Sequence, residues 1–271
     1  MFQSEYTPLT PNQDIIKREE YWNIAKGLQA TDGLQTSSYL ETVVADTLAN
    51  RYTTEQAAEN LYNHYNAMDP ESVEYKHKEA DIVAARITVC LERGDFKLSP
   101  ITLKTIHREL FQDVLPFKWV GEYRTENLSK KESVLNGASM IYGDFSAIDD
   151  YLRYDFDTEQ DAKYNTPFQE EDVHKFAKFI SAIWQAHPFR EGNTRTISTF
   201  AIKYLRTMGL QIDNVPFQEH SKWLRDALVR ANHTDVKNNI RPDASFLNMF
   251  FENVILSTGH DLLVLDLRGS I

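Results

Sequence analysis

Residues 187–195, HPFREGNTR, bring side chains suited to phosphate chemistry into one short segment. The imidazole of His187 can accept a proton at neutral pH. The carboxylate of Glu191 can hold Mg²⁺, which prefers a few carboxylate oxygens together with phosphates and water. The guanidinium of Arg195 has a fork of donors that suits phosphate oxygens. The segment therefore predicts a base, a metal ligand and a phosphate-binding group in one site.

Two amphipathic helices are expected to position this segment. His187 continues a stripe with helical spacing on the preceding helix. Pro188 disfavours helical geometry for the residue before it, so this helix should end at His187 with the imidazole pointing inward. A second stripe, from Ile197 to Met208, requires the next helix to begin near Asn193–Thr194. The first stripe consists of Val173, Phe176, Ala177, Ile180, Ile183 and Trp184.

The start of the second helix is expected to be an anion site. Its first N–H groups, at Gly192, Asn193 and Thr194, lack partners within the helix and lie at the positive end of the helix dipole. Gly192 would also let the backbone approach a ligand. Each feature has an ordinary alternative, because a histidine on an apolar stripe is often a core residue and a Gly-Asn pair is often only a turn and cap.

The string HPFREGNTRT resembles the signature of the Fic (Fic/Doc) family of protein adenylyltransferases, HxFx(D/E)GNGRxxR. The upstream segment VGEYRTENLSKKESVLNGASMIYGDF is similar to the strand and flap region of that family, and the resemblance covers about residues 100–256. It implies that His187 is the general base, that Phe189 anchors the loop in the core, and that Glu191 holds Mg²⁺ or Mn²⁺. It also implies that the phosphates of the substrate ATP are bound by Gly192, Asn193, Thr194 and Arg195.

Two positions depart from this signature. Thr194 replaces its second glycine, which adds a side chain but keeps the N–H group. Ser198 replaces its second arginine, which in the family clamps the γ-phosphate. Phosphate binding is expected to survive the first change, whereas the second leaves the orientation of ATP open.

An N-terminal segment, TSSYLETVV, resembles the inhibitory helix motif of the family, (S/T)xxxE(G/N). Ser37 and Glu41 stand in the two key places, four residues apart and hence on one helix face, and Thr42 stands where Gly or Asn is usual. The alternative is an ordinary amphipathic helix. In the family the glutamate pairs with the second arginine, so with Ser198 in that place the resemblance implies a leaky restraint.

Helical periodicity dominates the chain, so we expect an all-α protein with one short hairpin. The resemblance to the Fic family implies that this is a Fic-fold helical bundle with a short β-hairpin flap. Residues 1–98 are interpreted as an N-terminal helical region carrying the inhibitory helix, 99–256 as the catalytic domain and 257–271 as a tail. Polar residues to about 30 precede the first compact run. Helices are expected over about 37–68 (two, broken near 51–53), 72–94, 99–113, 145–154, 167–186, 193–208, 220–232 and 244–256.

The composition narrows the partners. Lys and Arg total 29 against 40 Asp and Glu, and a net charge of -11 argues against nucleic acid. No apolar run approaches the roughly 18 residues of a membrane span. The single cysteine, Cys90, cannot form an internal disulfide, and the N-terminus lacks the pattern of a signal peptide. A cytoplasmic protein is therefore expected.

The expected activity is transfer of AMP from ATP to a Ser, Thr or Tyr hydroxyl of a target protein and of the enzyme itself. His187 would accept the hydroxyl proton, and a flap near Asn127–Tyr142 would hold the target by adding a strand. Alternatives are transfer of another nucleotide or phosphate-containing group, and a non-catalytic interaction module of the same fold. Base choice could be set around Trp223 and Asn232.

Overall fold

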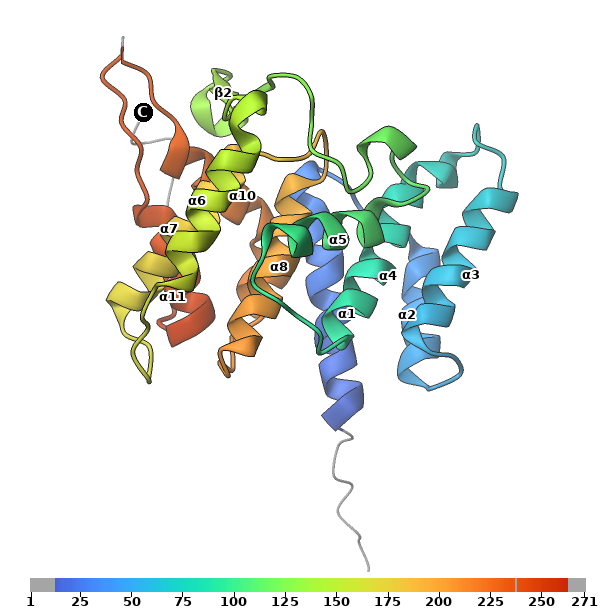
Figure 1. The fold of residues 1–271 in the computed structure, drawn as a ribbon. Coiled ribbons are helices and arrows are strands. Elements are labelled where there is room, and N and C mark those ends of the chain that lie inside the picture. The colour runs from blue at the N-terminus through green and yellow to red at the C-terminus, as the bar shows by residue number, and fades with distance from the viewer. Residues whose placement is uncertain (1–12, 237, 263–271) are drawn as a thin grey trace, which may run out of the picture.

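The computed structural model describes residues 13–236 and 238–262 and shows a helical protein with one two-stranded antiparallel sheet, as Figure 1 shows. The prediction of an all-α fold with a short hairpin is confirmed. The α-helices are α1 (Gln13–Gln29), α2 (Ser38–Leu48), α3 (Thr54–Ala67), α4 (Lys78–Glu92), α5 (Pro100–Phe111), α6 (Ile148–Gln160), α7 (Glu170–Ala186), α8 (Asn193–Thr207), α9 (Val215–Glu219), α10 (Ser221–Asn232) and α11 (Ser245–Leu256).

Helix α8 lies at the centre of the molecule. Its residues from Asn193 to Leu205 are all buried, as expected of a helix that other helices surround. It packs against α1, α4, α5 and α7. The apolar stripe predicted for α7 is buried too, and both helices end within a residue or two of the expected positions. These two helices form the frame for the segment between them.

Helix α1 was not predicted, because the residues up to about 30 were described only as polar. The helix packs along α4 and α9 and buries Trp22, Ile24 and Leu28. Gly27 lies so close to the backbone of Phe217 and Gln218 that a Cβ there would overlap it. This packing carries the end of α1, and the 3-10 turn η1 (Ala30–Asp32) after it, toward the start of α8.

Helices α2 and α3 confirm the predicted pair and lie together at one side of the bundle, on the right in Figure 1. Ser37 caps α2 by accepting a hydrogen bond from the N–H of Leu40, and Thr53 with Gln56 forms a capping box on α3. The helix expected from residue 72 begins instead with a 3-10 turn, η2 (Val73–His77), before α4.

The flap consists of strands β1 (Ser129–Lys131) and β2 (Ser139–Ile141), with Lys130 opposite Met140. The turn between them contains η4 (Ser133–Leu135) and ends with Asn136 in the left-handed conformation. Residues 1–12 and 263–271 lie outside the described residues, so most of the expected tail does too. Among the helices that the structure describes, none combines the length and the apolar character needed to cross a membrane.

Candidate active site

The loop between α7 and α8 begins at His187, where the backbone turns out of the helix. His187 is the C-cap of α7 and adopts the left-handed conformation, with φ 48° and ψ 59°. Its N–H donates to the carbonyl oxygen of Trp184 at 3.1 Å. The prediction that Pro188 ends the helix here is confirmed, because a residue before proline avoids right-handed helical geometry.

The imidazole of His187 is held in one orientation. Nδ1 lies 3.4 Å from the carbonyl oxygen of Trp184, which can only accept, so Nδ1 carries the proton and Nε2 of the neutral ring has a free lone pair. The ring stacks on Tyr142 of the flap, with centroids 3.5 Å apart. Burial, followed by the positive charge of Arg225, lowers the pKa of His187 well below its ordinary value. The ring is therefore a neutral proton acceptor at neutral pH.

The guanidinium of Arg124 fixes both the end of α7 and the flap. Its donors reach the carbonyl oxygens of His187 at 2.7 Å, Ala186 at 3.2 Å and Glu126 at 2.6 Å, and also that of Gly143. The backbone N–H of Arg124 donates to the carbonyl oxygen of Pro188 at 2.8 Å. One buried side chain thus joins the start of the loop to both ends of the hairpin.

The middle of the loop is anchored in the core, as the resemblance implied for Phe189. Phe189 is fully buried and stacks on His107, with centroids 4.0 Å apart. His107 accepts from the N–H of Gly121 through Nδ1 and donates from Nε2 to the carbonyl oxygen of Glu191, at 2.9 and 3.1 Å. These contacts fix a neutral tautomer, and burial lowers the pKa of His107 to about 4.

The Gly-Asn pair closes the loop. The amide of Asn193 accepts from the N–H of Phe189 and donates to its carbonyl oxygen, at 2.9 and 2.8 Å. Gly192 has φ 72°, and a Cβ there would overlap the ring of Phe111. Glycine is thus required at position 192 by its backbone conformation and by the ring of Phe111, whereas the sequence suggested close approach to a ligand. The Asn193 side chain holds the loop closed. The first N–H groups of α8 still lack partners within the helix.

A cleft of about 260 Å³ lies over this loop. Its lining includes the expected residues His187, Glu191, Gly192 and Asn193. Glu191 is exposed, and its carboxylate makes no hydrogen bond or ion pair with the residues that the structure describes. One free carboxylate beside a helix N-terminus matches the donor set of a magnesium ion that also binds phosphates and water. The rest of the lining is Asp32, Leu128, Ser129, Lys130, Tyr142, Arg190 and Arg225.

Arg195 does not line this cleft, and its expected contact with phosphate stays a prediction. The side chain is 2% exposed, and Nε lies 2.8 Å from Asp32 Oδ2. The two terminal nitrogens donate to Gln29 and Glu79 at 3.1 and 2.6 Å. The guanidinium also lies over the ring of Phe111. Arg195 thus ties the end of α1 and the start of α4 to α8, and its two terminal nitrogens donate to protein oxygens.

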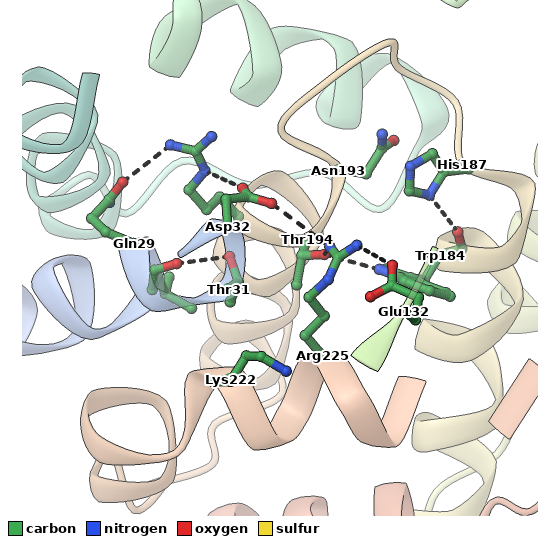
Figure 2. A network of polar contacts seen from close by, with 12 residues as sticks. Gln29, Thr31, Asp32, Glu132, Trp184, His187, Asn193, Thr194, Lys222 and Arg225 are labelled. Atoms are coloured by element: carbon green, nitrogen blue, oxygen red, sulfur yellow. Dashed lines mark hydrogen bonds and ion pairs between the residues drawn. The ribbon is translucent and has the colours of Figure 1, made fainter. Parts of the chain in front are cut away.

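Thr194 also turns into the protein rather than the cleft. Its hydroxyl accepts from Trp184 Nε1 at 3.0 Å and from Arg225 Nη1 at 3.2 Å. Arg225 comes from α10 and pairs with Glu132 of the flap turn at 2.6 Å and with Asp32 at 3.7 Å. Figure 2 shows Arg225 between Thr194, Glu132 and Asp32, at the edge of the site that contains His187. The cleft is therefore lined by an arginine of α10, which lies outside the signature segment.

The predicted inhibitory pair lies elsewhere. The Glu41 carboxylate is mostly exposed and pairs with Lys26 at 3.1 Å, and Ser37 hydrogen-bonds to Asp81. Neither lines the cleft. Ser198 is buried on α8. The carboxylate of the N-terminal region that reaches the cleft is that of Asp32, because α1 rather than α2 ends beside α8.

Sequence reasoning missed several residues of the site. For His107 and Arg225 a signal was present, because each is a polar residue within an apolar helical stripe. Arg124 and Asp32 carried no such signal, since both lie in short irregular segments and their partners are distant in sequence.

Replacing His107 by Gln should flatten the pH dependence of stability. Burial lowers the pKa of His107 from 6.5 to about 4. Between pH 6.5 and about 4 the His107 side chain is protonated in the unfolded chain but stays neutral in the folded chain. The free energy of unfolding therefore decreases as the pH falls through this range. The difference in unfolding free energy between wild type and variant should shrink by roughly 2 kcal/mol from about pH 7 to 5, measured by urea unfolding.

His64→Gln, at the far side between α2 and α3, controls for the loss of any histidine. A His107→Gln difference that stayed constant with pH would contradict the proposed burial of the neutral ring.

Comparisons with known proteins agree with this geometry. Residues 97–205 match the model of the Fic/DOC family. A relative named "Probable protein adenylyltransferase y4lH", from Sinorhizobium fredii, is 26% identical over 178 residues, 62% of this chain and 81% of that protein. Protein adenylyltransferase VbhT from Bartonella schoenbuchensis is 29% identical over 159 residues, 53% of this chain but only 31% of VbhT.

Among solved structures, a Fic family protein from Desulfovibrio desulfuricans G20 is similar in fold, with a TM-score of 0.51 and 14% identity. The match covers 99% of this chain and 75% of that one. At such identity the likeness concerns the fold alone. The match to the Fic/DOC family therefore rests on residues 97–205, which include the loop from His187 to Arg195.

Proposed function

We propose that this protein is a protein adenylyltransferase that moves AMP from ATP to a Ser, Thr or Tyr hydroxyl of a target protein and of itself. The observation that carries the proposal is the orientation of His187: its Nε2 lone pair is free, and its ring lines a cleft beside the N-terminus of α8. The names of the relatives y4lH and VbhT support the same activity.

The proposed reaction is an in-line displacement at the α-phosphorus of ATP. Nε2 of His187 accepts the proton of the target hydroxyl while the oxygen forms a bond to phosphorus. The bond from phosphorus to the bridging oxygen breaks, and pyrophosphate leaves with the bonding electrons. A neutral imidazole with a lowered pKa is ready for this step at neutral pH.

The phosphates would lie against the first turn of α8, where the N–H groups of Asn193 and Thr194 and the helix dipole favour negative charge. Glu191 would hold Mg²⁺ or Mn²⁺, which neutralises phosphate charge when bound. This part of the cleft would bind the phosphates and would not contact the base. Transfer from nucleotides other than ATP is therefore an alternative activity of the same site.

The target would dock on strand β1. Leu128, Ser129 and Lys130 line the cleft, so a segment added along this strand brings its hydroxyl toward His187. Main-chain hydrogen bonds of such an added strand depend little on sequence. The short, exposed β1 agrees with a docking edge of this kind.

We further propose that the N-terminal region restrains the activity through Asp32 rather than Glu41. The Asp32 carboxylate lies in the cleft and repels phosphate, while it occupies Arg195 and Arg225. The cleft of about 260 Å³ is also small beside the roughly 300–1,000 Å³ of pockets that enclose drug-sized ligands. Movement of η1 would therefore favour ATP binding.

His187→Ala should abolish transfer of label from α-labelled ATP while ATP binding is largely kept, because the change removes the base and leaves the first turn of α8 in place. Labelled protein on a gel and equilibrium ATP binding measure the two effects, with labelled GTP, CTP and UTP run in parallel. Transfer at the wild-type rate by the variant would rule out His187 as the base.

Glu191→Ala should remove the dependence of transfer on Mg²⁺ or Mn²⁺, with a rate at least about 100-fold below wild type, as is typical for loss of a metal-holding group. Titration of the metal against the transfer rate measures this. Glu126→Ala, which breaks the neighbouring ion pair with Arg190, is the matched control. A wild-type enzyme that needs no metal would remove Glu191 from this role.

Asp32→Asn should raise the rate of self-modification about fivefold, the factor expected from relieving roughly 1 kcal/mol of competition with phosphate. Glu41→Gln should leave the rate unchanged, because its carboxylate pairs with Lys26 outside the cleft. The opposite pattern, with Glu41→Gln activating and Asp32→Asn silent, would restore the inhibitory interpretation of Ser37 and Glu41.

A further inference from the structure

Arg225 is a buried cation that has no role in the proposed reaction of His187 and Glu191. It is 5% exposed, yet it lines the same cleft as His187 and Glu191. Burying a guanidinium is costly unless its donors and its charge are satisfied. A charge kept at the wall of a phosphate-binding cleft, rather than an apolar residue that would continue the stripe of α10, points to a ligand.

The contacts of Arg225 orient its donors. Nη1 donates to Thr194 Oγ1 at 3.2 Å, and Nη2 donates to Glu132 Oε1 at 2.6 Å. Asp32 lies further away, with Oδ1 at 3.7 Å from Nη1. Figure 2 shows the guanidinium between these three groups. Two partners thus fix the plane of the guanidinium, while the third, the Asp32 carboxylate, lies further from Arg225 and pairs more closely with Arg195, at 2.8 Å.

The other cations of the cleft wall are placed differently. Lys130 is an exposed residue of the flap, and Arg190 is half-buried, pairs with Glu126 at 2.6 Å and lies over Trp119. Arg195, which does not line the cleft, is enclosed by Gln29, Asp32 and Glu79. Of the cationic side chains in the cleft lining, Arg225 is the one that is buried, hydrogen-bonded to the first turn of α8 and next to the Asp32 carboxylate.

We propose that Arg225 is the phosphate-binding arginine of this chain and that a terminal phosphate of the nucleotide replaces the Asp32 carboxylate beside it. The inference rests on the proposed function and adds a residue to it. Thr194 and Ser198 then have linked explanations: the hydroxyl of Thr194 positions the guanidinium of Arg225, and Ser198 leaves α8 without an arginine at the position of the second motif arginine. The clamp comes from α10 instead.

The exchange is chemically balanced. A phosphate and a carboxylate are both oxygen anions, and a guanidinium binds either with charge-assisted hydrogen bonds. Glu132 stays in place and keeps Arg225 oriented, so the buried cation is never left without a partner. The bound phosphate would also accept hydrogen bonds from the N–H groups of the first turn of α8.

The test measures equilibrium binding of ATP and of adenosine to the full chain carrying His187→Ala, so that no turnover intervenes. Arg225→Gln should weaken ATP binding roughly 10- to 100-fold, the range for losing a charge-assisted hydrogen bond, and adenosine binding by less than about threefold. Arg225→Lys should lie between, because a point charge replaces the fork. Lys222→Gln, an exposed cation on the same helix that pairs with Asp226, is the matched control and should change neither.

A second variant separates phosphate binding from folding. Arg225→Gln alone leaves the Glu132 carboxylate buried without a cation, so the double variant Glu132→Gln/Arg225→Gln is measured as well. Continued loss of ATP binding with adenosine binding kept supports the proposal. Recovery of ATP binding in the double variant, or equal loss of ATP and adenosine, would assign Arg225 to holding the flap and overturn it.

The same series in an Asp32→Asn background tests the exchange. ATP binding should strengthen when Arg225 is present and change little when it is Gln, so the two substitutions are coupled. Additive effects would show that phosphate does not replace Asp32 at Arg225. Because binding is measured without transfer, a chain that fails to transfer AMP but follows this pattern would contradict the proposed function alone.

Discussion

The site depends on one buried guanidinium, that of Arg124. It is 4% exposed, and its donors are used by carbonyl oxygens of residues 126, 143, 186 and 187. Backbone carbonyl oxygens satisfy the donors of Arg124, and no carboxylate is in direct contact with it. The buried cation is therefore stabilised by the backbone of the loop and the flap. His187 can hold its left-handed turn and Tyr142 can stack on it because Arg124 joins the end of α7 to both ends of the flap.

A second group of charges surrounds the phosphate side of the cleft. Arg195 and Arg225 are both buried, and the carboxylates that compensate them come from three separate elements: Asp32 of η1, Glu79 of α4 and Glu132 of the flap turn. Breaking one partner of a buried pair is costly, because it leaves an uncompensated buried charge. Under the proposed exchange, phosphate would replace the Asp32 carboxylate while Glu79 and Glu132 keep both arginines paired.

The local features of the site could be predicted, whereas its long-range contacts could not. The stripe on α7, the proline after His187 and the start of α8 near Asn193 follow from spacing and backbone chemistry within about 20 residues. The direction in which the Arg195 side chain points, and the presence of Asp32 in the cleft, depend on contacts such as that of Arg195 with Gln29, 166 residues apart. Helix α1 was missed for the same reason, because its apolar residues are buried by packing against α4 and α9, which are distant in sequence.

This division explains how the two departures from the family signature should be understood. Judged along the sequence, Thr194 and Ser198 remove a glycine and an arginine, and both suggest a weakened site. Judged in space, Thr194 supplies a hydroxyl that receives Arg225, and the space around α8 holds a guanidinium from α10. A binding site is defined by which charges meet at the ligand, not by which segment contributes them. A motif position can therefore change without loss of function when a distant helix brings an equivalent group to the same point.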